Sequence, residues 1–457
     1  MTRAEELADF VGRVSYADMS DKAREQLKIR VLDSLGCAIG ALGGEPVRHI
    51  REQIRDFGGN GSCSIIGGVR AAPDRAAFYN SALVRYLDFN DSYLAKGETC
   101  HPSDNLGAVL AAAEYAGRNG RDFLAALATA YQVQCRLSDV APVRARGFDH
   151  TTQGAFALAA GISKALGLDR ERTVNAIAIC GTAFNALRVT RTGALSHWKG
   201  LAYPNTAFCC THGAFLAMRG VTGPREVFEG NKGFMDTISG RFVIDWSRED
   251  LERVTKTIIK KYNAEIHSQA AIEGLLELQR EHGFSAGEID GIEIDIFDVA
   301  YNIIGGGEEG DKTRVGSKEE ADHSLHYMVA VALLDGQVLP DQYRPERILR
   351  DDVQTLLRKV KVRSDEECSR LFPERHACRL RVTLHDGRVF SGQKLDYEGF
   401  HTRPADWEAV KKKFELLTGE FLDGRLSTAI IDAVANLEDI NVADLALLLS
   451  RVKPPVP

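Results

Sequence analysis

The stretch 103–117, SDNLGAVLAAAEYAG, decides the fold class for most of this chain. Its larger apolar residues recur at the i, i+3, i+4 and i+7 spacing that places one apolar stripe on a helix. These residues are Leu106, Val109, Leu110 and Ala113. Ser103 or Asp104 stands where the N-cap of such a helix belongs. We therefore expect an amphipathic helix that buries one face against neighbouring helices.

Helical patterns recur on both sides of this stretch, over roughly the first 265 residues. The further predicted helices are DRAAFYNSALVRYLDF after Pro73 (74–89), LAALATAYQVQ (124–134), TQGAFALAAGISKALGL (152–168), and a helix from Asn205 to Arg219 that stops at Gly220. The alanines and glycines of 152–168 predict close packing against neighbours. This part of the chain is predicted to be an all-α bundle.

The periodicity changes near residue 285. In GIEIDIFDV (291–299), isoleucines alternate with Glu293 and Asp295, which is the pattern of a half-buried strand. Alternation returns from Cys378 to Leu384, and Asp386-Gly387 then predicts a hairpin into RVFSGQKL (388–395). Between these strands lies ADHSLHYMVAVALLDG (321–336), an apolar helical segment.

The predicted fold class is therefore mainly α with an α+β part: a large all-α helical domain plus a smaller α+β lid domain. We expect residues 1–267 together with 401–457 to form the discontinuous helical domain. Residues 268–400 are expected to form the lid, which is inserted into it.

Composition excludes several classes of protein. The net charge is −7 with acids and bases interleaved, so neither nucleic acid nor an anionic membrane is an expected partner. The N-terminus lacks the apolar run of a signal peptide, and no window holds about 18 consecutive apolar residues. The nine cysteines show no C-x-x-C spacing, which argues against an iron–sulfur cluster. We expect a cytoplasmic protein.

Three polar segments are candidate sites. In YLDFNDSYLAKGETCHPSDN (86–105), His101 precedes a predicted helix start, where free N–H groups favour an anion such as a substrate carboxylate. The alternative is that Asp88 and Asp91 are ordinary loop carboxylates and that His101 lies at the surface.

The second segment, SHWKGLAYPNTAFCCTHG (196–213), contains Lys199 between an aromatic residue and a glycine, where it can point into a cleft or remain solvated. The third, IIKKYNAEIHSQAAIEG (258–274), lies at the predicted domain junction, a preferred place for ligands. A charged helix start would give a similar string. Metal-binding spacings, nucleotide fingerprints and Gly-x-Ser-x-Gly are all missing.

Taken together and in this order, these segments resemble the MmgE/PrpD family. RYLDFND, HPSDN, the WKG segment and AEIHSQ carry the resemblance, and DHTTQGAFALAAGISKALGL, TGPREVFEGNKGF, ADHSLHYMVAVALLDG and WEAVKKKF extend it over roughly residues 5 to 450. The resemblance implies a homodimer with a helical domain, an α+β lid and an active site between them. It also implies that neither a metal nor an organic cofactor is needed.

Family membership further implies an enzyme that acts on a small citrate-like tricarboxylate. The activities associated with the family are 2-methylcitrate dehydration, cis-aconitate decarboxylation and iminodisuccinate epimerisation. All need a base, an acid and cations that stabilise charge beside a carboxylate. The family's site positions fall on catalytic Asp88, His101, Lys199 and His267, and on substrate-binding Asn90, Ser92, His150, Lys260 and Gln269.

Within the family, AEIHSQ resembles the dehydratase branch of the methylcitrate cycle in propionate catabolism. The decarboxylase branch has histidine where this chain has Glu265. The expected activity is therefore that of a hydro-lyase, 2-methylcitrate dehydratase, with citrate as an open second substrate. The alternatives are a decarboxylase, an epimerase or a non-catalytic homodimer. Lys261 is the alternative to Lys260 as the ligand, and the roles of base and acid stay unassigned.

Overall fold

Helix-forming and strand-forming sequence separate into two units of the chain. The computed structural model describes residues 1–192 and 195–455. One unit, here the helical unit, comprises 1–190, 198–257 and 406–457; the other, the α+β unit, comprises 191–197 and 258–405. Helices account for 59% of the chain, and the largest sheet among the described residues is small and mixed, which confirms the predicted fold class. The domain boundaries that the sequence predicts at 267/268 and 400/401 stay a prediction.

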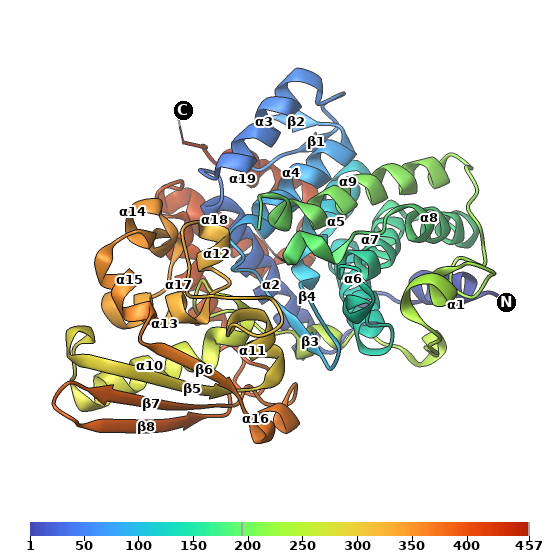
Figure 1. Cartoon of the computed structure of the whole chain (residues 1–457). Helices are drawn as coiled ribbons and strands as arrows, with labels where there is room; N and C mark the ends of the chain where they lie inside the picture. The colour runs from blue at the N-terminus through green and yellow to red at the C-terminus, as the bar shows by residue number, and fades with distance from the viewer. Residues whose placement is uncertain (193–194, 456–457) are drawn as a thin grey trace. The chain divides into compact units, whose positions relative to one another are not determined.

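The helical unit contains twelve named α-helices among its described residues, and two short hairpins (Figure 1). The helices are α1 (Arg3–Arg13), α2 (Asp21–Gly40), α3 (Glu45–Phe57), α4 (Pro73–Tyr86), α5 (Leu106–Tyr115), α6 (Gly120–Val140), α7 (Thr151–Leu166), α8 (Arg170–Ala183), α9 (Trp198–Met218), α17 (Trp407–Thr418), α18 (Gly424–Ala435) and α19 (Val442–Ser450). The hairpins pair β1 (Cys63–Ser64) with β2 (Arg70–Ala71), and β3 (Tyr93–Ala95) with β4 (Glu98–Cys100).

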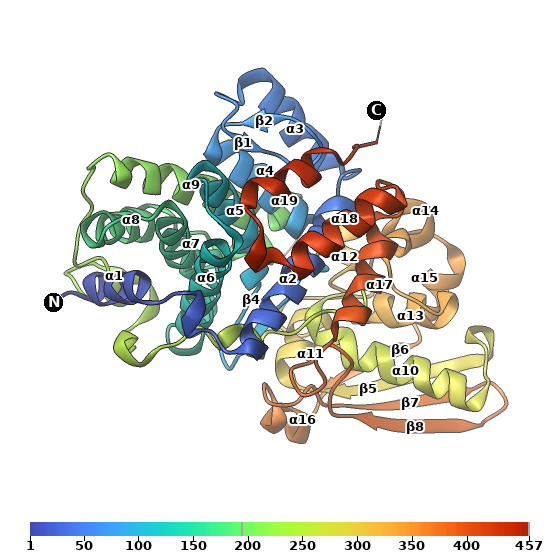
Figure 2. The ribbon, with the colours of Figure 1, turned by 180° about the vertical axis from the view of Figure 1, so that it is seen from behind.

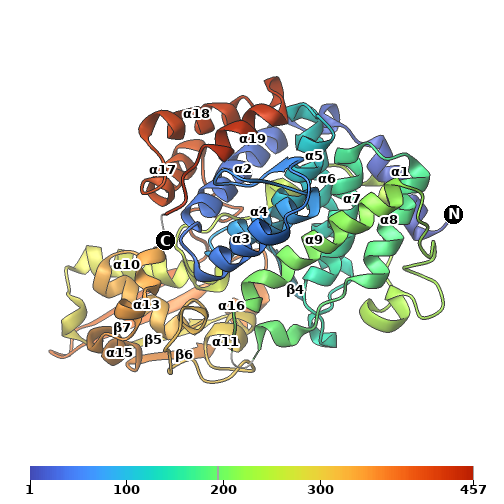
Figure 3. The ribbon, with the colours of Figure 1, turned by 90° about the horizontal axis from the view of Figure 1, so that it is seen from above.

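Small residues bring the central helices close together. Helices α7, α8 and α9 pack against one another, and α9 also packs along α4 (Figure 3). A Cβ atom at Gly154 of α7 would lie 2.4 Å from the ring of Tyr203 on α9, so only glycine fits there. Because of this close approach, the Tyr203 hydroxyl reaches Asn105 at 2.9 Å. The close packing predicted for 152–168 is therefore confirmed.

The C-terminal helices of the helical unit return to its N-terminal part. Helix α17 packs against α2, as Figure 2 shows from behind. Lys413 of α17 lies 2.7 Å from the buried Asp33 carboxylate of α2 and donates a 2.7 Å hydrogen bond to the carbonyl of Phe89. A buried carboxylate needs such a partner, and the same ammonium fixes the loop that follows α4.

The α+β unit is built around a four-stranded sheet in the order β6-β5-β7-β8 (Figure 1). Its strands are β5 (Ile289–Ile296), β6 (Val360–Ser364), β7 (Cys378–Leu384) and β8 (Val389–Lys394). Its helices are α10 (Gln269–His282), α11 (Asp298–Ile304), α12 (Lys318–Ala321), α13 (Leu325–Asp335), α14 (Pro345–Ile348), α15 (Asp351–Leu357) and α16 (Glu366–Leu371). Helix α10 packs against β7, β8 and α13, and α13 also contacts β6.

Three strands of the sheet, β5, β7 and β8, were predicted from the sequence, and the fourth, β6, was not. Strand β5 buries its isoleucines, pairs antiparallel with β7, and β7 continues through the predicted hairpin into β8. The added strand, β6, pairs parallel to β5 at the edge of the sheet. Only Val360 of this strand is fully buried, so its sequence lacks the clear alternation that reveals a half-buried strand.

Two predicted helix starts are wrong. Helix α9 begins at Trp198, not at Asn205, and runs through Pro204. An interior proline costs a helix about 3 kcal/mol, but packing against α4, α7 and α8 outweighs this local preference. Lys199 consequently lies in the first turn of α9. The helix predicted from Ser103 or Asp104 instead opens with a 3₁₀ turn, Pro102–Asn105, and α5 begins at Leu106.

We predict that Lys413→Met lowers the free energy of unfolding by about 3–5 kcal/mol, because it leaves a buried carboxylate without its ammonium. Urea unfolding followed by circular dichroism measures this change. Lys412→Met, on the exposed side of the same helix, is the matched control. The double variant Lys413→Met/Asp33→Asn should regain much of the loss. An unchanged free energy for Lys413→Met would contradict a stabilising role.

Candidate active site

The loop after α4 holds a carboxylate in an unusual backbone conformation. Asp88 has φ of +54°, a left-handed value that costs energy for any residue with a side chain. Its carboxylate lies 2.6 Å from Nη1 of Arg85 and 3.3 Å from Nζ of Lys199. All three side chains are buried. Two cations that hold one carboxylate keep it ionised and compensate for the strained backbone.

Arg85 links this carboxylate to the candidate histidine. Its side chain is only 2% exposed, and its Nη2 lies 3.4 Å from Nε2 of His101. Nε of the same guanidinium lies 3.7 Å from Asp104. Because a guanidinium stays protonated in proteins, this site holds a permanent buried positive charge.

The contacts of His101 determine its tautomer. Nδ1 lies 2.9 Å from the main-chain oxygen of Asp91, and a carbonyl oxygen can only accept a hydrogen bond. Nδ1 therefore carries the proton. Nε2 faces the guanidinium of Arg85, which can only donate, so Nε2 carries the lone pair. The contacts of His101 thus favour a neutral imidazole whose basic nitrogen lies beside a cation.

Hydrogen bonds around His101 stabilise the loop that follows α4. Ser92 Oγ lies 3.0 Å from Nδ1 of His101, and the Asn90 amide donates to Ser103 Oγ at 2.8 Å and to Asp104 at 2.9 Å. These bonds place the predicted ligands Asn90 and Ser92 next to the imidazole. Their role in contacting substrate stays a prediction.

The expected anion site at the start of this helix is wrong. The N–H of Ser103 donates to the Asp91 carboxylate at 3.0 Å, so an internal carboxylate already takes the place expected for the substrate. The other oxygen of Asp91 accepts from Tyr131 at 2.8 Å. Burial raises the pKa of Asp91, against these hydrogen bonds, which lower it. Asp91 is therefore part of the scaffold of the site.

His150 is the second imidazole of the helical unit. It stands directly before α7, and its ring centroid lies 5.5 Å from that of His101 in an edge-on arrangement. Its Nδ1 lies 3.2 Å from the carboxylate of Asp149. The ring of Tyr203 stacks on that of His150 with the centroids 6.0 Å apart. The structure thus places Asp88, His101, His150 and Lys199 near one another in the helical unit. Their roles in one site with His267 stay a prediction.

In the α+β unit, the two candidate lysines differ in environment. Lys260 is 1% exposed, and its charge lowers the pKa of Glu265. Lys261 is half-buried and forms ion pairs with Glu273 at 3.0 Å and Glu398 at 2.7 Å. Burial works to lower the pKa of Lys261, but these two pairs raise it above its usual value. Lys261 is therefore engaged in a structural ion network, and Lys260 is the better candidate ligand.

Glu265 and His267 form a buried pair in the same segment. One oxygen of Glu265 accepts from the His267 main-chain N–H at 2.8 Å, and the other lies 2.7 Å from Nδ1. Burial alone would raise the pKa of Glu265. The charge and hydrogen bond of His267, followed by the charges of His323 and Lys260, outweigh burial and lower that pKa to about 2. An ionised Glu265 holds the proton of His267 on Nδ1.

Gln269 has a different position from the one expected of a ligand. Its oxygen accepts from the main-chain N–H groups of Lys261 and Tyr262 at 3.0 Å each. Its nitrogen donates to the carbonyls of Tyr262 and Ala264 at 3.0 and 3.1 Å. The amide thus fixes the 261–264 loop that joins Lys260 to Glu265. Direct contact between Gln269 and a substrate stays a prediction.

Two profiles of one family match this sequence. The MmgE/PrpD N-terminal domain matches residues 5–247, and the MmgE/PrpD C-terminal domain matches residues 262–439. The chain belongs to the MmgE/PrpD family. The resemblance stated from the eight motifs is therefore confirmed.

Relatives of this MmgE/PrpD protein carry two activities in their names. Cis-aconitate decarboxylase of Mus musculus is 26% identical over 99% of this chain and 93% of its own length. The 2-methylcitrate dehydratase of Escherichia coli (strain K12) is 28% identical over 87% of this chain and 86% of its own length. The mitochondrial 2-methylcitrate dehydratase of Yarrowia lipolytica is 27% identical, covering 96% and 88%. These relatives support an enzyme without selecting one activity.

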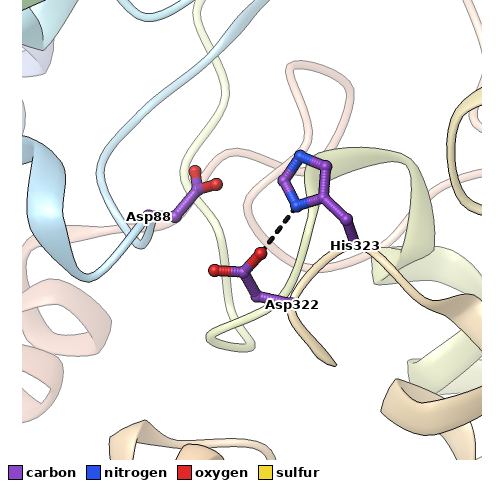
Figure 4. A group of neighbouring side chains, drawn as sticks. All are labelled: Asp88, Asp322 and His323. Atoms are coloured by element: carbon purple, nitrogen blue, oxygen red, sulfur yellow. Dashed lines mark hydrogen bonds and ion pairs between the residues drawn. The ribbon is translucent and has the colours of Figure 1, made fainter. Parts of the chain in front are cut away.

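Sequence reasoning missed several buried charged groups of this MmgE/PrpD chain. Arg85 stands three residues before Asp88, within the motif RYLDFND, and that spacing could have pointed to it. His323 Nδ1 contacts the Asp322 carboxylate at 2.7 Å (Figure 4), and Asp322 in turn accepts from Lys318 at 3.0 Å. A histidine that directly follows an aspartate, as in Asp149-His150, was the available signal.

Across residues 1–192 and 195–455, no helix combines the length and apolar character that crossing a membrane requires.

We predict that His376→Phe reduces the loss of unfolding free energy that occurs when the pH is lowered from 7 to 5. His376 lies fully buried among the rings of Phe297, Tyr397 and Phe400, and burial, followed by the neighbouring His267, lowers its pKa from 6.5 to about 3. Between these pH values the unfolded chain binds a proton that the folded chain does not, so stability falls as the pH falls.

The variant should therefore gain about 2 kcal/mol relative to wild type when the pH is lowered from 7 to 5. Denaturant unfolding at several pH values measures this gain. His385→Gln, at an exposed histidine of the same unit, should leave the profile unchanged. Parallel profiles for His376→Phe and wild type would show that His376 titrates normally in the folded chain.

Proposed function

We propose that this chain is a 2-methylcitrate dehydratase, a hydro-lyase that eliminates water from 2-methylcitrate to give 2-methyl-cis-aconitate. Citrate, giving cis-aconitate, is the second substrate to test. The catalysis is acid–base chemistry that needs no metal or organic cofactor.

The observation that carries this proposal is the cluster of buried cations around a neutral imidazole in the helical unit. Elimination of water beside a carboxylate needs a base for the carbon-bound proton and fixed cations for the charge that develops on the carboxylate. The lone pair of His101 Nε2 suits the first requirement. Arg85 and Lys199, preorganised by their contacts with Asp88, suit the second.

Glu265 favours dehydration over decarboxylation. A free carboxylate would repel a tricarboxylate substrate, but Glu265 is ionised and paired with His267. The motif AEIHSQ, with glutamate at 265, resembles the dehydratase branch. Cis-aconitate decarboxylase is the second candidate, because the mouse enzyme of that name covers 99% of this chain at 26% identity.

We further propose a homodimer in the cytoplasm that serves propionate catabolism through the methylcitrate cycle. The partner expected for the site is a small tricarboxylate, with no nucleic acid and no membrane involved. Light scattering of the purified protein tests the dimer, and a mass equal to one chain would contradict it. One relative is named as mitochondrial, so fractionation of the source cell tests the compartment.

The assay that tests the activity uses chelator-treated protein with 2-methylcitrate and, separately, with cis-aconitate. We expect the ultraviolet absorbance of the conjugated alkene to rise with 2-methylcitrate, and no carbon dioxide to be released from cis-aconitate. Carbon dioxide from cis-aconitate without alkene from 2-methylcitrate would establish the second candidate instead. Loss of all activity with chelator, restored by a metal, would contradict the cofactor-free mechanism.

Lys199→Met should lower kcat/KM for 2-methylcitrate by about 10²–10³-fold, the usual loss when one group that stabilises transition-state charge is removed. Steady-state kinetics of alkene formation measures this loss. Lys22→Met, at an exposed lysine of the helical unit, is the matched control and should retain wild-type kinetics. Retained activity in Lys199→Met would exclude the ammonium from the catalytic site.

A further inference from the structure

The two imidazoles of the helical unit have opposite partners. His101 and His150 lie with ring centroids 5.5 Å apart and are both buried. Nδ1 of His101 faces a neutral carbonyl oxygen, whereas Nδ1 of His150 faces a carboxylate. Adjacent titratable groups in contrasting environments take different protonation states, and such a contrast assigns acid and base roles.

The surroundings of His101 disfavour a second proton. Nε2 lies 3.4 Å from the guanidinium of Arg85, so a proton on Nε2 would set one N–H against another and place two positive charges in contact. The group that faces Nδ1, the main-chain carbonyl of Asp91, is neutral. His101 therefore rests with a lone pair on Nε2, which is the state required of a general base.

The surroundings of His150 favour the imidazolium. Asp149 is fully buried, and its Oδ1 lies 3.2 Å from Nδ1 of His150 while accepting from the Thr151 N–H at 3.1 Å. That N–H bond stabilises the ionised carboxylate. Arg188 Nη1 lies 4.0 Å from the other carboxylate oxygen of Asp149.

The start of helix α7 works against a positive charge on His150, but its effect is the smaller one. A helix N-terminus lowers the pKa of a nearby cation by less than about one pH unit. An opposite charge within about 4 Å shifts the pKa of a group by about one to three pH units. The Asp149 carboxylate, 3.2 Å from Nδ1, is therefore the contact that favours the imidazolium of His150, against both burial and the helix start.

We propose that His101 is the general base and His150 the general acid of the dehydration, an assignment that rests on the proposed function. Nε2 of His101 takes the proton from the carbon beside a substrate carboxylate. The electron pair of that C–H bond forms the alkene, the C–O bond of the neighbouring carbon breaks, and the hydroxyl leaves as water with the proton of His150 Nε2. Exchange with solvent then resets both imidazoles.

Asp149 is a positioning residue in this scheme. It keeps the proton of His150 on Nδ1 and so directs Nε2, the nitrogen that gives its proton, away from the carboxylate. Asp88 has a different role. Its carboxylate is held by Arg85 and Lys199, which makes it a poor base and a good anchor for the two cations.

A change of leaving group separates the two roles. The probe is the 2-methylcitrate analogue with fluorine in place of the tertiary hydroxyl, because fluoride leaves without being protonated. We expect His150→Gln to lower kcat for 2-methylcitrate by about 10²–10⁴-fold and for fluoride release by less than about tenfold. His101→Gln should lower both reactions by a similar large factor, since each needs the base.

Asp149→Asn keeps an oxygen for the Thr151 N–H and should show the same selectivity as His150→Gln, with a smaller loss. A merely structural role would lower both reactions equally. His49→Gln, at an exposed histidine of α3, is the matched control. Thermal melting checks that each variant folds, and should Asp149→Asn fail to fold, His150→Gln alone decides the test.

Two results would overturn the assignment while leaving the dehydratase intact. One is an equal loss of both reactions in His150→Gln. The other is the reverse pattern, in which His101→Gln spares fluoride release. A wild-type protein that eliminates neither water nor fluoride would overturn the proposed function itself, and the assignment with it.

Discussion

The guanidinium of Arg85 is a permanent charge removed from water, and the segment that follows α4 is arranged to satisfy it. Burial of an isolated ion costs many kcal/mol, so the surrounding chain must supply acceptors. Asp88, Asp104 and the imidazole of His101 do so. The same arrangement sets the tautomer of His101. A strained backbone at Asp88 is tolerated because its carboxylate completes this cluster.

The α+β unit also contains a buried charge that needs partners, but there the charge is negative. Glu265 is a buried anion, and the cationic surroundings supplied by Lys260 and the nearby histidines keep it ionised. Gln269 fixes the loop between Lys260 and Glu265 through four main-chain hydrogen bonds. Each unit thus presents charged groups whose positions are determined before any ligand arrives, and such preorganisation is what electrostatic catalysis requires.

The sequence predicted the parts of the fold in which one local pattern dominates. The spacing in 103–117 predicted a helix and the alternation in 291–299 predicted a strand, and the structure has both elements there. Strand β5 buries one face as expected, whereas α5 is buried on every side and not along one apolar stripe. The prediction failed where tertiary contacts override local preference. Pro204 lies inside α9 because neighbouring helices hold it there, and edge strand β6 has too few buried residues to show alternation.

For the candidate site, too, the sequence indicated some residues and concealed those whose role depends on tertiary contacts. Asp88, His101, His150 and Lys199 could be proposed because the family resemblance pointed to these positions, and the structure places them near one another. Arg85 was missed because an arginine in a helix is usually solvated, and only the fold reveals its burial. The structural use of Asp91 and Gln269 was also hidden, since a hydrogen bond to the main chain leaves no mark in the sequence.

The protonation of His101 tests this account most directly. Nitrogen-15 NMR of protein labelled at its histidines, at neutral pH and without substrate, reports which ring nitrogens carry protons, and the spectrum of His101→Gln identifies the relevant signals. The account predicts a neutral His101 with a protonated Nδ1 and a bare Nε2. A proton on Nε2 would contradict it, because the cluster around Arg85 would then leave no base at this position.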